Sequence, residues 1–233
     1  MRIIALPGVF RPRSDSWMLA HLVGRDQRVP GADVLDVCTG SGLIAVAAAR
    51  AGAASVTAVD VSRRAVATAR LNGALNGVKL ATARGDLLNS VPGRQFDVIA
   101  CNPPYLPADR GDLPDRGPER AWEGGRDGRV LLDRVIASAP GRLRPGGVLW
   151  LVHSSVCGIG QTLSALQDAG LDAVVAESRR GPLGPLLAAR ARELVSRGLL
   201  EPGQSDEDVV AIRATAPGRS AAVSRLPAGR APR

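Results

Sequence analysis

The sequence has few of the residues that mark exported, metal-binding or membrane proteins. Its 233 residues include three cysteines, Cys38, Cys101 and Cys157, which lie far apart and form no C-x-x-C pair. Neither a disulfide framework nor a cysteine zinc site is therefore predicted. No apolar run approaches the length of a membrane span, and Pro7 and Gly8 interrupt the short apolar stretch at the start. We expect a cytoplasmic protein with no metal site and no membrane partner.

Lysine, histidine and aromatic residues are also scarce. Lys79 is the only lysine, so the net charge of +8 comes almost entirely from arginine, which a GC-rich genome encodes whatever the partner. His21 and His153 stand alone, and we expect them in the core or on the surface. The segment 215–233 contains four arginines and no acid, and without it the net charge falls to +4. We predict that this segment is a disordered basic tail.

Apolar segments of strand length alternate with helical patterns along most of the chain. Strand patterns at 33–38 and 55–60 precede helical patterns at 43–52 and 62–76, and a final strand pattern covers 208–214. This alternation predicts an α/β fold with a doubly wound, seven-stranded, mostly parallel sheet whose last strand is antiparallel. The length suits one domain, placed at 25–214 after a cap segment at 1–24.

Two helical patterns lie outside that alternation. In the first, "RPRSDSWMLAHLV", Asp15 or Ser16 is a candidate helix cap. The second, at 182–198, predicts a helix that ends at Gly198 and carries Arg190, Arg192 and Arg197 on a solvated face.

A glycine loop follows the first predicted strand, in "VLDVCTGSGLIA". Gly40 and Gly42 lie between strand and helix, Ala45 stands where a dinucleotide fingerprint accepts Gly or Ala, and Asp60 follows about 20 residues after the loop. Alone, this pattern fits a nicotinamide enzyme, a protein with another nucleoside cofactor, or a tight strand-to-helix turn.

Asp36 separates the first two alternatives. A carboxylate four residues before Gly40 would face a pyrophosphate, and like charges about 4 Å apart repel by roughly 1–4 kcal/mol. S-adenosylmethionine has no phosphate there and carries an ammonium and a sulfonium, so the sequence favours it over NAD. Asp86 ends the third apolar run and is a candidate acceptor for an adenine amino group, with Leu87 against the ring.

The stretch "CNPPYLP" follows a predicted core strand and cannot continue it, because proline has no backbone N–H group. The side-chain oxygen of Asn102 and the carbonyl of Pro103 can each accept one hydrogen of a planar NH2 group, while Tyr105 lies against its flat face. Such a nitrogen is a poor nucleophile, so orientation carries more of the catalysis than deprotonation. The three residues are the predicted catalytic group.

Together these motifs resemble the class I S-adenosylmethionine-dependent methyltransferases, and within them the release-factor glutamine N5-methyltransferases (HemK-like). The segments that carry the resemblance are "VLDVCTGSG", "VD", "GD", "NPPY", "FRPRSDSWML", "AWEGGRDGR" and "RLRPGGVLWLV". They extend from about Val9 to His153. "NPPY" alone is shared with DNA adenine and RNA methyltransferases, so the glycine-rich loop after it carries the specificity.

The resemblance implies S-adenosylmethionine as cofactor and a protein glutamine, such as that of a release factor, as methyl acceptor. The cofactor residues that it implies are Ser16, Asp36, Cys38, Gly40, Asp60, Asp86, Leu87 and Asn102. Cys38 stands where many members have glycine. The chain resembles short members, some of which work with a small activating partner protein. An adenine or guanine amino group of nucleic acid is the alternative acceptor, which the six aromatic residues and scattered arginines disfavour. Trp122 is either a lid contact or a loop anchor.

Overall fold

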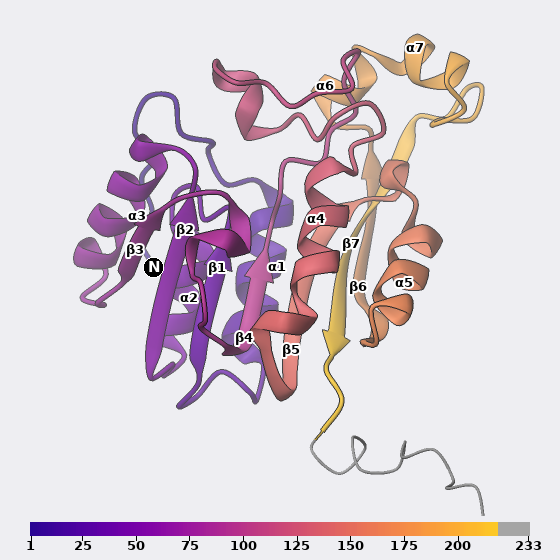
Figure 1. Ribbon diagram of the computed structural model, residues 1–233. Coiled ribbons are helices and arrows are strands. Elements are labelled where there is room, and N and C mark those ends of the chain that lie inside the picture. The colour runs from indigo at the N-terminus through magenta and orange to yellow at the C-terminus, as the bar shows by residue number, and fades with distance from the viewer. Residues whose placement is uncertain (219–233) are drawn as a thin grey trace, which may run out of the picture.

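The core of the protein is one seven-stranded sheet (Figure 1). Its strands are β1 (Asp33–Val37), β2 (Ser55–Asp60), β3 (Ala81–Arg84), β4 (Phe96–Cys101), β5 (Leu143–Ser154), β6 (Asp172–Pro182) and β7 (Asp206–Thr215). This computed structural model describes residues 1–218. The strand order is β3-β2-β1-β4-β5-β7-β6, and among the described strands β7 alone runs in the direction opposite to the other six. The doubly wound sheet and its antiparallel last strand are confirmed.

Helices cover both faces of the sheet (Figure 1). They are α1 (Ser14–Arg25), α2 (Leu43–Arg50), α3 (Arg63–Leu75), α4 (Val130–Ser138), α5 (Ile159–Asp168), α6 (Pro185–Ala188) and α7 (Ala191–Ser196). Neighbouring residues of β1 face opposite sides, as the strand period of two requires. Val34 packs in the cluster with α1 and α2, whereas Leu35 packs in the cluster with α4 and α5. Because both faces are covered, apolar residues point to both sides of the central strands, with Asp36 as a buried exception in β1.

The chain reverses its winding direction between β1 and β4. From β1 it moves outward through β2 and β3, and from β4 it moves the other way through β5. Ligands of such sheets bind beyond the carboxyl ends of the strands at this reversal. The glycine loop follows β1 and the "NPPY" motif follows β4, so both lie at the reversal.

Two predicted boundaries are wrong. Helix α1 begins at Ser14 with Arg13 at the N-cap, so neither Asp15 nor Ser16 caps it; both side chains bind elsewhere, as described below. The predicted helix at 182–198 consists of the two short helices α6 and α7, separated at Ala189 and Arg190. The Arg190 side chain, at this break, reaches back to the loop after "NPPY".

The end of the sheet also differs from the prediction. Thr215 belongs to β7, where it pairs with Val148 and Asp172. Beyond it, the Ala216 N–H donates to the Gly147 carbonyl at 2.8 Å. A tail that starts at residue 215 therefore begins too early, because sheet pairing continues past that point. Residues 219–233 of the predicted tail lie outside the described residues.

Candidate active site

Two cavities meet above the carboxyl ends of β1 and β4. The large cavity, about 1000 Å³, is lined by the glycine loop, the end of β2, residues 84–87 and residues 8–12. The small cavity, about 500 Å³, lies between "NPPY", α1 and the segment from β6 to α6. Both are lined by Phe10, Asn102, Pro104 and Ala121. A ligand in one cavity would therefore contact the same asparagine as a ligand in the other.

The glycine loop has three residues with positive φ: Cys38 at 57°, Gly40 at 52° and Gly42 at 80°. A side chain at position 42 would come within 2.8 Å of Ala69, so glycine allows α2 to pack against α3. A side chain at position 40 would meet only the Cys38 carbonyl within 4 Å, which leaves the space above the loop open to a ligand. Cys38 adopts a conformation that glycine adopts more easily.

Backbone N–H groups of the loop already have partners inside the protein. The Thr39 N–H donates to the Val59 carbonyl at 3.0 Å, and the Gly42 N–H donates to the Thr39 carbonyl at 2.7 Å. The Gly40 N–H donates to the Asp60 carboxylate at 2.9 Å. A pyrophosphate bound to a glycine loop needs such donors. The N–H groups of Thr39, Gly40 and Gly42 are therefore not free to bind a phosphate.

Asp36 does not line either cavity, which differs from its predicted position facing the ligand. Its fully buried carboxylate accepts hydrogen bonds from the Thr39 hydroxyl at 2.5 Å and the Ala45 N–H at 3.1 Å. Burial raises the pKa of Asp36 to about 7. The Asp36 side chain thus braces the loop from beneath and joins it to α2.

The other predicted cofactor residues do line the large cavity. They are Ser16, Cys38, Gly40, Asp60, Asp86, Leu87 and Asn102. Asp60 accepts hydrogen bonds from the N–H groups of Gly40 and Ser62 at 2.9 Å, and burial raises its pKa. Asp86 forms an ion pair with Arg134 at the half-exposed edge of the cavity. Their roles toward a cofactor stay predictions.

Asp15 fixes the orientation of the "NPPY" side chains. The Asn102 amide nitrogen donates to the Asp15 carboxylate at 3.1 Å and to the Ser16 hydroxyl at 3.0 Å. The Tyr105 hydroxyl donates to the same carboxylate oxygen at 3.1 Å. Because a carboxylate only accepts hydrogen bonds, the amide nitrogen must face Asp15, which turns the amide oxygen away from it. Desolvation, and then Asp15, raise the pKa of Tyr105 well above its usual value.

The chain after "NPPY" is held by the glycine-rich loop at 121–129. The Leu106 N–H donates to the Trp122 carbonyl at 2.7 Å, and the Gly124 N–H donates to the Leu106 carbonyl at 2.9 Å. A side chain at Gly128 would come within 2.2 Å of the Tyr105 carbonyl, so only glycine fits. Trp122 also lines the small cavity. It is therefore a loop anchor as well as a cavity wall.

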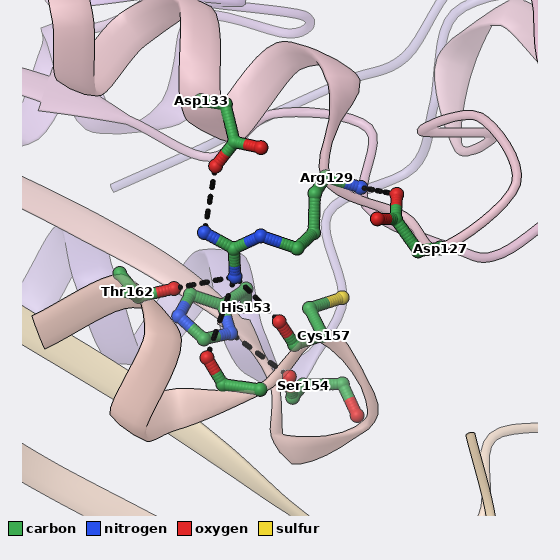
Figure 2. A network of polar contacts seen from close by, with 8 residues as sticks. Asp127, Arg129, Asp133, His153, Ser154, Cys157 and Thr162 are labelled. Carbon is green, nitrogen blue, oxygen red and sulfur yellow. Dashed lines mark hydrogen bonds and ion pairs between the residues drawn. The ribbon is translucent and has the colours of Figure 1, made fainter. Parts of the chain in front are cut away.

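A buried arginine connects this loop to α5 (Figure 2). The Arg129 side chain is 2% exposed and donates to the Cys157 carbonyl at 2.5 Å, to the Thr162 hydroxyl at 2.9 Å and to Asp133 at 2.6 Å. The Cys157 thiol in turn donates to the Tyr105 carbonyl at 3.1 Å. Arg129 was not a predicted site residue, yet it holds the turn that contacts "NPPY".

Two arginines of the segment at 182–198 bind the same region. Arg190 donates to the Pro107 carbonyl at 2.8 Å and to Glu123 at 2.9 Å. Arg197 donates to the Ala108 carbonyl at 3.2 Å. The prediction of a solvated face is wrong for these two residues, because their side chains fix the loop after the motif.

His153 lies beside the Arg129 network and is fully buried (Figure 2). Burial lowers its pKa from 6.5 to about 4. Because the unfolded chain takes up a proton near pH 6.5 and the folded chain does not, this histidine reduces stability as the pH falls from 6.5 toward 4, by up to about 3 kcal/mol.

We expect the His153→Gln variant to lose less stability than the wild-type protein over that pH range. Urea unfolding of both proteins between pH 7 and pH 4.5 measures the difference. Asp36 titrates with the opposite sign in both proteins, since its raised pKa favours the folded state as the pH falls, and its contribution cancels in the comparison. Parallel stability curves for the two proteins would contradict the prediction.

The sequence of this chain matches a protein-family model and several curated proteins. The family model described as methyltransferase small domain matches residues 1–112. A protein of Methanocaldococcus jannaschii, provisionally named a protein N5-glutamine methyltransferase, is 36% identical over 81% of this chain and 93% of its own length. A release factor glutamine methyltransferase of Bordetella pertussis is 37% identical over 76% of this chain and 67% of its own length.

Among solved structures, the E. cuniculi Mtq2–Trm112 complex, described as responsible for methylation of the eRF1 termination factor, has a similar fold. It aligns with a TM-score of 0.62 and 22% identity over 90% of this chain and 99% of that chain. The chain spans only 42–58% of the length of several other curated relatives that it matches. The chain is thus similar to one relative over nearly its whole length and to others over about half.

Proposed function

This chain belongs to the methyltransferase family that includes the protein N5-glutamine methyltransferases, and we propose that it methylates the side-chain amide nitrogen of a glutamine in a protein, with S-adenosylmethionine as donor. The single observation that carries the proposal is the clamp of Asp15 and Ser16 on the Asn102 amide nitrogen, at 3.1 and 3.0 Å. It leaves the amide oxygen of Asn102 as an acceptor at the junction of the two cavities.

The large cavity suits S-adenosylmethionine. Three N–H groups of the glycine loop, those of Thr39, Gly40 and Gly42, are engaged within the protein and so are not donors for a pyrophosphate, which this cofactor lacks. Asp60 would accept hydrogen bonds from ribose hydroxyls, while Asp86 and Leu87 would contact the adenine. When bound, the cofactor supplies an electrophilic methyl group on a sulfonium.

The small cavity suits a planar NH2 group. The Asn102 side-chain oxygen and the Pro103 carbonyl would accept its two hydrogens, which orients the nitrogen. Because Asp15 and Ser16 hold the asparagine in advance, little reorganisation is needed at the moment of reaction. Phe10, Tyr105 and Trp122 line this cavity, so a flat amide would lie against aromatic rings.

A peptide chain release factor is the acceptor that we propose, because relatives of this chain are named for that substrate. A small activating partner protein is part of the proposal as well, on the likeness to a methyltransferase that was solved as a complex. The three aromatic rings in the small cavity would also accommodate a nucleobase, so the test must separate the two classes of acceptor.

The test is transfer of radiolabelled methyl from S-adenosylmethionine into a hypomethylated lysate, followed by separate protease and nuclease treatment. We expect protease-sensitive label, and mass spectrometry of the labelled protein should place one methyl group on a glutamine. Label that only nuclease releases would overturn the proposal in favour of a nucleic-acid acceptor. A protein that binds S-adenosylhomocysteine but transfers no methyl group to any lysate would instead be a binding module. This outcome requires that transfer is also absent when cell extract is added as a source of partner protein.

A further inference from the structure

The N-terminal segment Met1–Pro12 lies along α3 and over the large cavity without forming a helix or a strand. Its residues Gly8, Val9, Phe10 and Pro12 line that cavity. Within residues 1–218, the hydrogen bonds that join Met1–Pro12 to the rest of the chain all go to two side chains of α3 and its C-cap, Asn72 and Asn76. Two amides therefore supply the hydrogen bonds that position this cavity wall, beside the packing of Ile3 against the core.

Each amide binds both backbone groups of one residue in the segment. Asn72 accepts from the Ile4 N–H at 3.0 Å and donates to the Ile4 carbonyl at 2.8 Å. Asn76 accepts from the Arg2 N–H at 2.9 Å and donates to the Arg2 carbonyl at 2.7 Å. Four residues of helix rise by about 6 Å, close to the roughly 6.6 Å between alternate residues of an extended chain. The distance between Asn72 and Asn76 along the helix thus matches the distance between Ile4 and Arg2 along the extended segment.

Asn72 also joins the segment to the glycine loop. Its amide nitrogen donates a second hydrogen bond to the Ser41 carbonyl at 2.7 Å, and the Asn72 side chain is fully buried. Ser41 lines the large cavity, as do Gly8 and Phe10. One buried side chain therefore fixes two walls of the same cavity.

We propose that Asn72 and Asn76 are positioning residues for the cofactor, which hold Met1–Pro12 closed over the large cavity. The proposal rests on the proposed function, since it takes the large cavity as the site of S-adenosylmethionine. If only the closed segment contacts the cofactor fully, the apparent dissociation constant rises as the closed fraction falls. Cofactor binding and segment closure then strengthen each other.

Asn76 is the better residue to change, because it is half-buried whereas Asn72 is fully buried. Asn76→Ala removes the hydrogen bonds to Arg2 and should raise the dissociation constant of S-adenosylhomocysteine about three- to tenfold, the effect of one or two hydrogen bonds. Asn76→Asp places an acceptor against the Arg2 and Asn72 carbonyls and should have at least the same effect. Leu75→Ala, on the same helix and 43% exposed, is the matched control and should bind as the wild type does.

Calorimetry measures the dissociation constant of S-adenosylhomocysteine for the wild type and for the three variants. Cleavage by chymotrypsin after Phe10 measures closure of the segment. S-adenosylhomocysteine should protect Phe10 in the wild type and less so in both Asn76 variants. In the transfer assay, the KM for S-adenosylmethionine should rise in these variants while kcat at saturating cofactor stays within about twofold. Folded Asn76 variants with wild-type affinity and wild-type protection would overturn the inference. A wild-type protein that does not bind the ligand would instead contradict the proposed function.

Discussion

Asn102→Ala is expected to lower the rate of methyl transfer by about a hundredfold or more, with most of the cofactor affinity retained. In the proposed function the asparagine oxygen accepts a hydrogen bond from the substrate NH2 group, and loss of one such preorganised contact costs a factor of this size. The clamp of Asp15 and Ser16 means that the wild-type side chain adopts this orientation before substrate binds. Transfer of labelled methyl under saturating cofactor measures the rate, and calorimetry with S-adenosylhomocysteine measures the affinity.

The control for this variant is Asn89→Ala. Asn89 is exposed, lies in the short turn at 87–90 and lines neither cavity. It should transfer methyl at the wild-type rate. A rate for Asn102→Ala within about threefold of wild type would reduce "NPPY" to a structural turn.

Arg129→Ala is expected to destabilise the protein by about 3–4 kcal/mol. The substitution leaves the Cys157 carbonyl and the Thr162 hydroxyl without their buried donor and opens a cavity where a large side chain was packed. This is a large fraction of the roughly 5–15 kcal/mol that a domain of this kind has in total. Urea unfolding, followed by circular dichroism, measures the loss.

Arg134→Ala, on α4 just after the Arg129 N-cap, is the matched control. Its side chain is 40% exposed and its partner Asp86 is 54% exposed, so the loss should stay below about 1 kcal/mol. Arg129→Met fills much of the volume but makes no hydrogen bonds. It therefore separates the contribution of packing to stability from the contribution of the hydrogen bonds. Equal stability of Arg129→Ala and Arg134→Ala would show that the buried network does not stabilise the fold.

The sheet and most of the cavity lining could be predicted because they depend on local pattern. Strand periodicity and strand-to-helix alternation place Gly40, Asp60, Asp86 and Asn102 at the same edge of a sheet, and a parallel sheet brings such ends together. The predicted position of the Asp36 side chain was wrong because that prediction also rested on local pattern alone. Its position at a strand end was correct, but the sequence could not show that the side chain turns beneath the loop toward Thr39.

The parts that escaped prediction depend on pairs distant in sequence. Asp15 contacts Asn102 from 87 positions away, and no periodicity links the two. In an arginine-rich chain, composition predicts that an arginine such as Arg129 lies on the surface. Arg129 is instead buried, where a carbonyl group of a distant turn accepts its hydrogen bond. Arg190, between the two short helices, likewise contacts Pro107 from 83 positions away.

The order of the strands also sets an order for assembly. In the sheet, β6 pairs only with β7, which is inserted between β5 and β6 although it comes later in the chain. During synthesis, β6 therefore has no sheet partner until residues 206–215 are made. The small cavity depends on both strands, through Arg179–Pro182, Glu207 and Val209, whereas within residues 1–218 the large cavity is lined only by residues between Gly8 and Arg134. On a growing chain, the large cavity, proposed to hold the methyl donor, can thus form early, while the small cavity, proposed to hold the methyl acceptor, is completed only when the last strand enters the sheet.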